Sequence, residues 1–277
     1  MIPAAFDYER ADSVDRAISL LQQGGEDAKL LAGGHSLIPL MKLRLARPSL
    51  LVDIGRLDEL SYVRDAGEHV AIGALTRHHD VATSDVLEQQ CGILSHAAAG
   101  IGDPQVRHLG TIGGSVAHGD PASDLPTVLL ALDATFLAKG PDGERELAAA
   151  DFFTGLFETA LAPTEVLTEI RVRKLDGAGW SYEKFHQRSQ DWAIVGVAAV
   201  AGSNGDGTAV ALTNMGDRPL RARGVEEGLA SGSGAADAAA RADEGTSPPS
   251  DTFASAGYRK ELAKVLTRRA LEASLRA

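Results

Sequence analysis

Two adjacent glycines between a predicted strand and a predicted helix constrain the fold of this chain more than any other feature. Residues 29–32 form an apolar strand candidate, and Gly33-Gly34-His35-Ser36 follow directly. Residues 37–46 then carry apolar and basic side chains at helical spacing and end before a proline. A second strand candidate occupies residues 49–54. The pattern predicts a compact βαβ-like unit whose helix begins at the glycines.

This first double-glycine loop, residues 32–36, has the chemistry of an anion site. Glycine lets the backbone approach a ligand closely, and the first turn of a helix offers N–H groups that have no partner inside the helix. A pyrophosphate suits that environment. Ser36 is also a good helix N-cap, and the alternative is that it plays only that structural role.

A second double-glycine loop reads Thr111-Ile112-Gly113-Gly114-Ser115. Either loop alone is more typical of an ordinary tight turn, because glycine is a usual residue of turns. Together the loops say more, since the second can close on the same phosphates from the other side. Its amides and its two flanking hydroxyls would then replace counter-cations. The pair therefore predicts one diphosphate site built from two distant segments.

Other phosphate-binding classes and nucleic-acid binding are not supported by the sequence. Gly100-Ile101-Gly102 lacks the third glycine of a dinucleotide fingerprint, and the chain has no Gly-x4-Gly-Lys-Ser/Thr motif. With 38 acidic and 27 basic residues the formal net charge is −11, which argues against a nucleic-acid partner. A single cysteine, Cys91, excludes an internal disulfide and cannot by itself build an iron–sulfur cluster.

The pattern along the chain changes near residue 176. Before it, helical periodicity covers residues 12–23, 85–99 and 124–132, strand candidates cover 70–75, 135–137 and 166–172, and residues 100–115 are turn-rich. Thr76 is a candidate helix cap. After it come strand-like runs at 180–185, 193–201 and 209–214, a hairpin turn at 204–207, and a closing helix around 258–266. Two or three compact units are expected.

Membrane, secretion and metal signals are missing from the sequence. The longest apolar run, residues 193–201, falls far short of the ~20 residues that span a bilayer. The first residues carry neither a basic region nor an apolar stretch, so we expect a cytoplasmic protein. His78, His79, His108 and His118 do not form a metal-binding set, and no metal is expected on this chain.

The residues around both glycine loops resemble one known family. The run from Ala32 to Pro48 is similar to the medium subunit of aerobic carbon monoxide dehydrogenases, and so are residues 110–115 and 120–126. Residues 216–222 and 258–262 resemble the second domain of these subunits. The resemblance covers effectively the whole chain. The subunits belong to a wider flavin-binding group that is shared with xanthine dehydrogenases.

The resemblance implies an α+β fold and a domain organisation. Residues 1–175 would form an FAD-binding domain of the vanillyl-alcohol-oxidase type, with two α/β subdomains at about 1–56 and 57–175. Residues 176–277 would form a small C-terminal domain with an antiparallel sheet and helices.

The resemblance also implies FAD contacts, but no catalytic residue. The glycine loops would grip the pyrophosphate, and Ile101 and Gly102 would lie against the flavin. Asp124 has an alternative as an N-cap, and Trp192, expected near the isoalloxazine, has an alternative as a buried core residue. The implied contacts are Ala32, Gly33, Gly34, His35, Ser36, Leu37, Ile101, Gly102, Thr111, Ile112, Gly113, Gly114, Ser115, Asp124, Leu167, Lys184 and Trp192.

The implied function is electron transfer in a molybdenum hydroxylase. A molybdenum-binding large subunit would oxidise the substrate, an iron–sulfur small subunit with [2Fe–2S] clusters would relay electrons, and FAD on this chain would pass them to an external acceptor. Carbon monoxide is the first choice of substrate, with aldehydes, purines and N-heterocycles as alternatives. The complex would be a dimer of heterotrimers, cytoplasmic or peripheral at the inner membrane face. Two rival functions stay open: a self-sufficient FAD oxidase and a non-redox nucleotide-binding regulatory or assembly protein.

Overall fold

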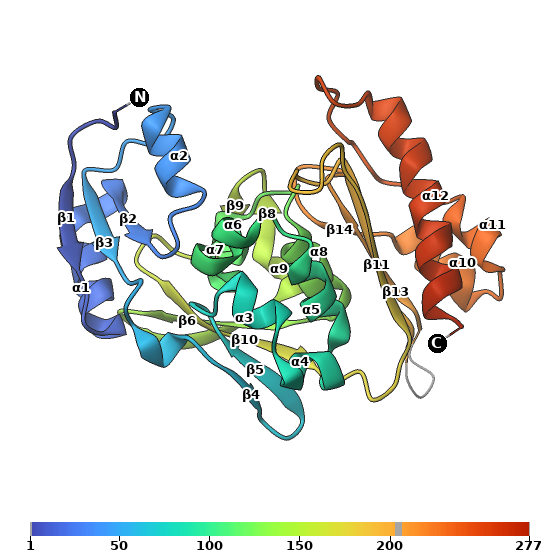
Figure 1. Ribbon diagram of the computed structural model, residues 1–277, viewed down its shortest axis with the longest axis horizontal. Helices are drawn as coiled ribbons and strands as arrows, with labels where there is room; N and C mark the ends of the chain where they lie inside the picture. Colours follow the sequence, from blue (N-terminus) through green and yellow to red (C-terminus); the bar gives the residue numbers. More distant parts are fainter. Residues whose placement is uncertain (1, 203–206, 277) are drawn as a thin grey trace.

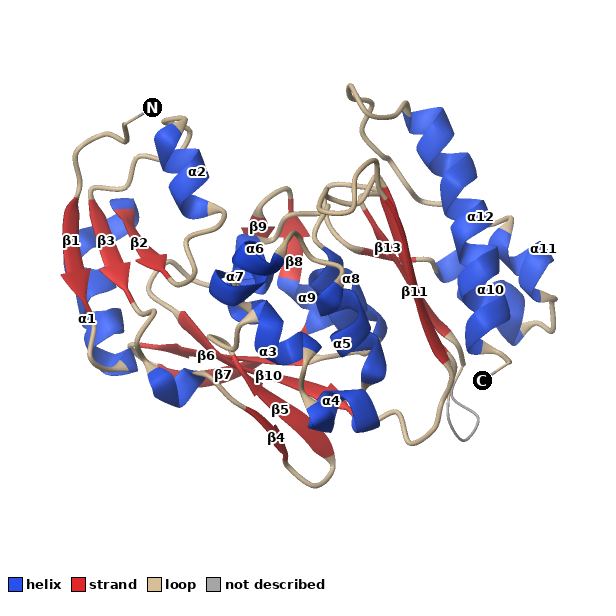
Figure 2. Ribbon diagram, in the orientation of Figure 1, coloured by secondary structure: helices blue, strands red, loops and turns tan. Residues whose placement is uncertain are grey.

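The protein is built from three units, each with its own sheet. The computed structural model describes residues 2–202 and 207–276. The N-terminal and C-terminal units lie on opposite sides of a larger central unit (Figure 1). Every unit combines strands with helices (Figure 2), and the C-terminal sheet is antiparallel. The predicted α+β fold is confirmed.

The N-terminal unit is a parallel three-stranded sheet with two α-helices. Its elements are β1 (Asp7–Arg10), α1 (Val14–Gly24), a 3₁₀ turn (Gly25–Asp27), β2 (Ala28–Leu31), α2 (Leu37–Lys42) and β3 (Leu50–Asp53), in the strand order β1-β3-β2. The Ser13 hydroxyl starts α1 by accepting from the Arg16 amide, and Ile18 and Leu21 anchor the helix in the core. The predicted βαβ unit is therefore confirmed, with β1 as an additional edge strand.

The central unit packs helices on a five-stranded antiparallel sheet with the order β4-β5-β10-β6-β7. One continuous core joins the helices to the sheet. It contains the fully buried side chains of Ile93 in α5 (Gly92–Ala99), Leu129 in α8 (Asp124–Ala131) and Phe136 in β6 (Thr135–Gly140). The elements are a 3₁₀ turn (Asp58–Leu60), β4 (Val63–Asp65), β5 (His69–Gly73), α3 (His78–Ala82), α4 (Asp85–Gln90), α5 (Gly92–Ala99), α6 (Pro104–Leu109), α7 (Ile112–His118), α8 (Asp124–Ala131), β6 (Thr135–Gly140), β7 (Gly143–Ala148), α9 (Ala149–Phe152), β8 (Phe153–Gly155), β9 (Glu158–Thr159) and β10 (Val166–Arg173).

The C-terminal unit is an antiparallel sheet that carries its own helices on one face and packs against the central unit with the other. Its elements are β11 (Trp180–Phe185), β12 (Val195–Val200), β13 (Ala209–Thr213), β14 (Leu220–Arg221), α10 (Arg223–Ala230), α11 (Ala235–Ala239) and α12 (Ala256–Ser274). Alternate residues of β12 face opposite sides: Val195 and Val197 join a core with α12, while Ala198 and Val200 join the core of the central unit. A continuous apolar strand results, because both faces are buried. The C-terminal sheet is thereby fixed against the central unit.

Three local predictions were wrong. Residues 100–115 are not merely turn-rich, because they contain α6 and the start of α7, which begin at the capping residues Asp103 and Thr111. The helical stretch 85–99 is broken at Cys91 into α4 and α5. Thr76 caps no helix; its hydroxyl accepts from the Tyr62 amide and donates to the Tyr62 carbonyl. The hairpin turn predicted at 204–207 falls largely outside the described residues.

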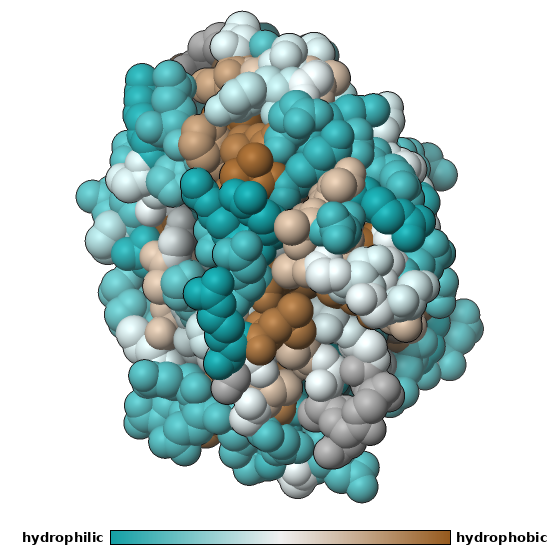
Figure 3. Space-filling view, turned by 90° about the vertical axis from the view of Figure 1, so that its right-hand side faces the viewer, coloured by the Kyte–Doolittle hydropathy of each residue, from teal (hydrophilic) through white to brown (hydrophobic). Residues whose placement is uncertain are grey.

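The outer surface of the C-terminal unit is mainly hydrophilic, with small separate hydrophobic areas (Figure 3). Isolated apolar side chains of this kind are normal on a folded surface. In the described ranges, no helix combines the length and the apolar character needed to cross a membrane.

Candidate functional site

A cavity of about 590 Å³ is lined by residues of all three units. Its N-terminal wall includes Leu30 and Ile54, its central wall includes Ile101, and its C-terminal wall includes Lys184 and Trp192. Every implied FAD contact except one lines this cavity: Ala32, Gly33, Gly34, His35, Ser36, Leu37, Ile101, Gly102, Thr111, Gly113, Gly114, Ser115, Asp124, Leu167, Lys184 and Trp192. Segments that are up to 160 residues apart in the sequence, from 32 to 192, are thus brought to one site.

Ile112 is the exception. Its side chain is fully buried in the core of the central unit, and its amide donates to the Thr76 carbonyl at 3.0 Å. This residue anchors the start of α7 against the β5–α3 connection, and it presents neither its side chain nor its amide to the cavity.

The first glycine loop presents a row of free backbone amides. The amides of Gly33, Gly34, His35, Ser36 and Leu37 have no hydrogen-bond acceptor within the described part of the chain, and only from Ile38 onward does α2 close its own ladder. The Ser36 hydroxyl makes no capping bond, so the alternative of a purely capping serine is wrong. Consecutive free N–H groups that line a cavity form a concave site for an anion.

The two positions of this loop require glycine for different structural reasons. Gly34 has φ +71°, a left-handed conformation that favours glycine. At Gly33 a Cβ atom would lie 2.0 Å from the Leu109 carbonyl oxygen, so this glycine permits a close approach of two backbone segments. The segment that comes close to Gly33 is part of the protein and not a ligand, because residues 109–110, just before the second loop, pack directly against the first loop. Arg77 reinforces this junction by donating to the carbonyls of Leu109 and Gly55.

The second glycine loop differs from the prediction, because its amides are already used. It forms the first turn of α7, where the Gly113 amide donates to the Ala74 carbonyl at 2.9 Å and the Gly114 amide donates to the Thr111 hydroxyl oxygen at 3.0 Å. A Cβ atom at Gly113 would lie 2.5 Å from the Ala74 carbonyl oxygen. The loop therefore contributes a closely packed wall and hydroxyl groups to the cavity, rather than free amides.

The loop at Gly100-Ile101-Gly102 is held in place by two cationic side chains. Arg107 donates to the carbonyls of Ile101 at 2.8 Å and Gly102 at 3.3 Å, and Lys184 donates to the Gly100 carbonyl at 3.2 Å. Gly102 adopts φ +51°. This arrangement fixes the backbone that forms one wall of the cavity, and it leaves the Ile101 side chain packed against the central core.

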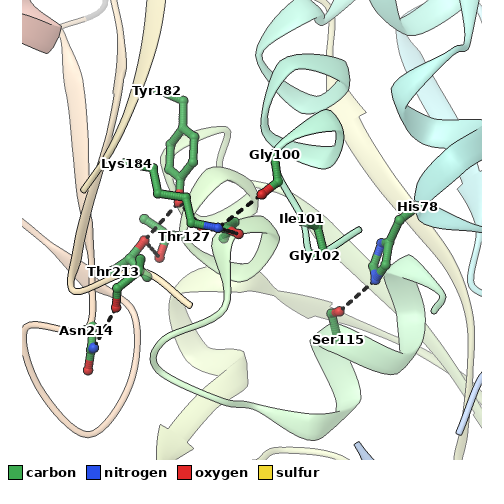
Figure 4. A network of polar contacts seen from close by, with 12 residues as sticks. His78, Gly100, Ile101, Gly102, Ser115, Thr127, Tyr182, Lys184, Thr213 and Asn214 are labelled. Carbon is green, nitrogen blue, oxygen red and sulfur yellow. Dashed lines mark hydrogen bonds and ion pairs between the residues drawn. The ribbon is translucent and has the colours of Figure 1, made fainter. Parts of the chain in front are cut away.

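Tyr182 and Lys184 of β11 belong to a buried polar network that joins the C-terminal unit to the central unit (Figure 4), and both donate to the Asp124 carboxylate. One carboxylate oxygen accepts from the Tyr182 hydroxyl at 2.6 Å, and the other accepts from the Lys184 ammonium group at 2.8 Å. Burial raises the pKa of Asp124, and the nearby ammonium group and hydroxyl oppose that rise. Ser123 occupies the N-cap position of α8, so the N-cap interpretation of Asp124 is wrong. Both Asp124 and its partner Lys184 line the cavity.

Trp192 and Leu167 line the cavity from different units. Trp192 belongs to the connection between β11 and β12 and is 56% exposed, so its interpretation as a buried core residue is wrong. An exposed ring at the edge of a cavity is placed to cover a flat ligand. Leu167 lies at an irregularity in the pairing of β10 with β6 and is 5% exposed.

The sequence did not single out two further cavity residues. His78 opens α3 and is 4% exposed, and burial together with the positive charge of His35 and Arg107 lowers its pKa to about 4. Val106 of α6 packs beside Gly102, where a Cβ atom would lie 2.9 Å from it. No sequence signal marks either residue, since both reach the cavity only through the packing of short helices. Among the described residues, no group of three or more potential ligands could hold a metal ion.

The cavity fits a dinucleotide cofactor such as FAD. Its volume lies within the range of roughly 300–1,000 Å³ that is usual for ligand sites. The amides of the first glycine loop, which are unpaired within the described residues, supply anion donors, and apolar side chains such as Leu30, Ile54 and Ile101 supply walls for ring systems. A pyrophosphate that joins two ring-bearing halves has the matching distribution of charge and apolar surface.

Comparison with known proteins agrees with this geometry. Residues 4–174 match the family model of the FAD-binding domain in molybdopterin dehydrogenase, and residues 180–274 match that of the carbon monoxide dehydrogenase flavoprotein C-terminal domain.

Individual relatives span nearly the whole chain. The carbon monoxide dehydrogenase medium chain of Hydrogenophaga pseudoflava is 42% identical, over 99% of this chain and 98% of its own. The glyceraldehyde dehydrogenase medium chain of Sulfolobus acidocaldarius is 40% identical, over 98% of this chain and 99% of its own. A solved carbon monoxide dehydrogenase from H. pseudoflava superposes with a TM-score of 0.96 at 41% identity, covering 100% of this chain and 99% of that one. The chain therefore belongs to the family of FAD-binding medium subunits of carbon monoxide dehydrogenases and related molybdopterin dehydrogenases.

Proposed function

We propose that this chain binds FAD across the three-unit cavity, with the pyrophosphate at the free amides of residues 33–37 and the isoalloxazine between the Ile101-Gly102 loop and Trp192. The observation that carries the proposal is the row of five consecutive amides in the cavity lining, residues 33–37, that have no acceptor within the described ranges of the chain. An anion is the ligand that such a row stabilises. The adenosine half would then lie toward the N-terminal unit, against Leu30 and Ile54.

The role of the chain is to position the flavin as the electron outlet of a molybdenum hydroxylase. FAD supplies the redox chemistry, and the protein residues bind and orient it and cover one of its faces. The single cysteine is fully buried, and burial raises the pKa of Cys91 to about 12. Because this chain cannot ligate an iron–sulfur cluster with cysteines, electrons must arrive from clusters on another subunit.

The proposed partners are an iron–sulfur small subunit and a molybdenum-binding large subunit, assembled as a dimer of heterotrimers. Relatives named as medium chains belong to carbon monoxide and glyceraldehyde dehydrogenases, and one solved relative is a quinoline 2-oxidoreductase from Pseudomonas putida, 32% identical with a TM-score of 0.92. Carbon monoxide is the proposed substrate of the complex, with an aldehyde or N-heterocycle as the alternative. We place the complex in the cytoplasm, where its acceptor could hold it at the inner membrane face.

The proposed domain division is residues 1–175, with subdomains at about 1–56 and 57–175, and residues 176–277. The two family matches, 4–174 and 180–274, support a boundary near residue 176. The C-terminal domain would contribute Lys184 and Trp192 to the flavin end of the site, so both domains would be required for a complete cavity.

Co-expression with the neighbouring genes tests this function. The purified complex is expected to contain one FAD per copy of this chain, together with molybdenum and iron–sulfur subunits, and to reduce an artificial acceptor when supplied with carbon monoxide. Reduction with an aldehyde or N-heterocycle, but not with carbon monoxide, would change the substrate and leave the electron-outlet role intact. A colourless chain that purifies alone and binds ATP but not FAD would contradict the proposal and favour a regulatory nucleotide-binding protein.

A further inference from the structure

His78 and Ser115 face each other at the wall of the cavity (Figure 4). The imidazole Nε2 lies 3.3 Å from the Ser115 hydroxyl oxygen, and no other hydrogen bond of that hydroxyl is found in the described part of the chain. Nδ1 of His78 is buried and has no hydrogen-bond partner among the described residues. The contact between His78 and Ser115 is therefore the one hydrogen bond of this hydroxyl within the described residues. Because Ser115 lines the cavity, its hydroxyl can make a second hydrogen bond to a ligand there.

The ring of His78 is held by its surroundings in one orientation. The side chain is 4% exposed, and a Cβ atom added at Gly110 would lie 2.7 Å from its Cδ2 atom and 3.0 Å from its Nε2 atom. The His78 amide donates to the Gly110 carbonyl at 3.0 Å. The Gly110 backbone thus packs against the ring edge, and the absence of a side chain there lets Nε2 reach Ser115.

Burial keeps the imidazole of His78 neutral, and the basic groups around it act in the same direction. His35 of the first loop, Arg107 of α6 and Arg77 beside it are the titratable neighbours, and all of them disfavour a further positive charge. Together with burial, they lower the pKa of His78 to about 4. At neutral pH the ring therefore carries a single N–H, on either Nδ1 or Nε2.

The contacts of the two nitrogens decide which one carries the proton. With the proton on Nδ1, the ring would bury an N–H group that has no acceptor in the described structure. With the proton on Nε2, the N–H has the Ser115 oxygen as its acceptor, and only a lone pair at Nδ1 is left without a partner. Orphaned buried N–H groups are rare in native proteins, so the Nε2–H form is the one that this environment stabilises.

We propose that His78 is a positioning residue for the cofactor: its Nε2–H donates to the Ser115 oxygen, which leaves the Ser115 hydroxyl proton free to donate to a phosphate oxygen of FAD. The inference rests on the proposed placement of the pyrophosphate at the glycine loops. It assigns a donor to the second loop, whose amides at residues 112–114 are occupied within the protein. In the reverse arrangement, with Ser115 donating to His78, the hydroxyl would present only lone pairs to an anion.

Ligand binding by the purified full-length chain, freed of flavin, tests the proposal. Dissociation constants are measured by calorimetry at pH 7.5 for FAD, for ADP, which carries the pyrophosphate without a flavin, and for riboflavin, which carries the flavin without a phosphate. Ser115→Ala should weaken FAD and ADP about tenfold, which is the effect of losing one hydrogen bond to a charged group. His78→Leu keeps the hydroxyl but removes the neutral group that orients it, so it should weaken both ligands by a smaller factor, about threefold. Neither variant should change the riboflavin constant by more than about twofold, because riboflavin has no phosphate for Ser115 to contact.

A matched pair of amide substitutions separates hydrogen bonding from packing. In His78→Gln the amide nitrogen can occupy the position of Nε2 and still donate to Ser115, whereas in His78→Asn it is confined near Nδ1. We expect Gln to retain most of the ADP affinity and Asn to lose as much as Leu. The Gln and Asn variants also keep the test decisive if the Leu variant fails to fold.

The double variant His78→Leu/Ser115→Ala should bind ADP no more weakly than Ser115→Ala alone, because His78 acts through Ser115. Additive losses, an equal loss for riboflavin, or unchanged ADP binding in His78→Asn would each overturn the proposal. If the wild-type chain bound riboflavin but neither FAD nor ADP more tightly, the proposed pyrophosphate site itself would fail. If the wild-type chain bound FAD tightly and the His78 variants bound FAD and ADP equally well, only the role of His78 would be overturned.

Discussion

Gly33 is the position where the account makes its sharpest mutational prediction. A Cβ atom there would lie 2.0 Å from the Leu109 carbonyl oxygen and 2.9 Å from the Gly110 Cα atom, both of which are backbone atoms. To reach the 3.0 Å that real Cβ contacts respect, the two segments must separate by at least 1.0 Å. Neither atom is the end of a flexible side chain, so Gly33→Ala must displace the first loop or the residues before the second.

The expected magnitudes follow from that displacement. Overpacking of this kind costs about 1–3 kcal/mol in the free energy of unfolding. A hydrogen bond to a charged group contributes about 1.5–3 kcal/mol, so misplacing two of the five free amides should weaken FAD binding at least ~100-fold. Urea unfolding of the flavin-free chain and calorimetric titration with FAD measure the two effects separately.

Gly257→Ala is the matched control. Gly257 lies in the first turn of α12, and a Cβ atom there meets nothing within 4 Å. The substitution should leave FAD affinity unchanged and should not lower the free energy of unfolding, because alanine is the better helix former by up to ~1 kcal/mol. Wild-type FAD affinity and stability in Gly33→Ala would refute the close approach of the two loops on which the site depends.

Three further predictions concern the polar network, the exposed ring and the buried histidine. Lys184→Met leaves the buried Asp124 carboxylate without its cation and should lower the free energy of unfolding in urea by about 3–5 kcal/mol. Adding Asp124→Asn should recover much of this loss. A double variant as unstable as Lys184→Met would contradict the pairing. Trp192→Ala should change the free energy of unfolding by less than about 0.5 kcal/mol, because the ring is 56% exposed, while altering the flavin absorption spectrum; a large loss of stability with an unchanged spectrum would restore the core interpretation. The pKa of His78 is lowered to about 4 in the folded chain, so the unfolded chain binds a proton first as the pH falls. The free energy of unfolding should therefore decline between about pH 6.5 and 4, by up to roughly 3 kcal/mol. The same decline in His78→Gln would contradict this assignment.

The sequence predicted those parts of the fold whose periodicity is long enough to identify. β11 was predicted at its observed bounds, 180–185, and α8 and β13 to within one residue. The apolar run at 193–201 was predicted as a strand although it does not alternate, and the structure shows the reason: every residue of β12 is buried. The sheet pairings behind these strands bring distant segments together, and single-sequence patterns do not show such long-range packing.

Short elements were missed for a different reason. α6 and α7 have six and seven residues, about two turns each, which is too few for a helical pattern to stand out. The sequence did contain the signals that start both helices. Asp103 precedes a proline, and the Thr111 hydroxyl accepts a hydrogen bond from the amide of Gly114, three residues later. Capping residues could therefore have found both helices where periodicity could not.

The candidate site was predicted as a set of residues more accurately than as a set of roles. Glycine doublets and the family resemblance located the walls of the cavity, but not which amides are free. That distinction depends on tertiary contacts. The first amides of α7 donate to the carbonyls of Thr76 and Ala74, whereas the amides of the first loop meet no acceptor among the residues that the structure describes. The assignments of Ile112 and Trp192 turned on burial, and that of Asp124 turned on the start of α8 after Ser123; a single sequence reveals neither at these positions.

Amide hydrogen exchange with and without FAD tests the central claim most directly. In the flavin-free chain, the amides of residues 33–37 should exchange rapidly, and those of 112–114 should already be protected by their internal hydrogen bonds. Saturation with FAD should slow exchange at 33–37 more than elsewhere in the chain. Tight FAD binding without any new protection at 33–37 would contradict the account, because the pyrophosphate would then lie away from the first glycine loop.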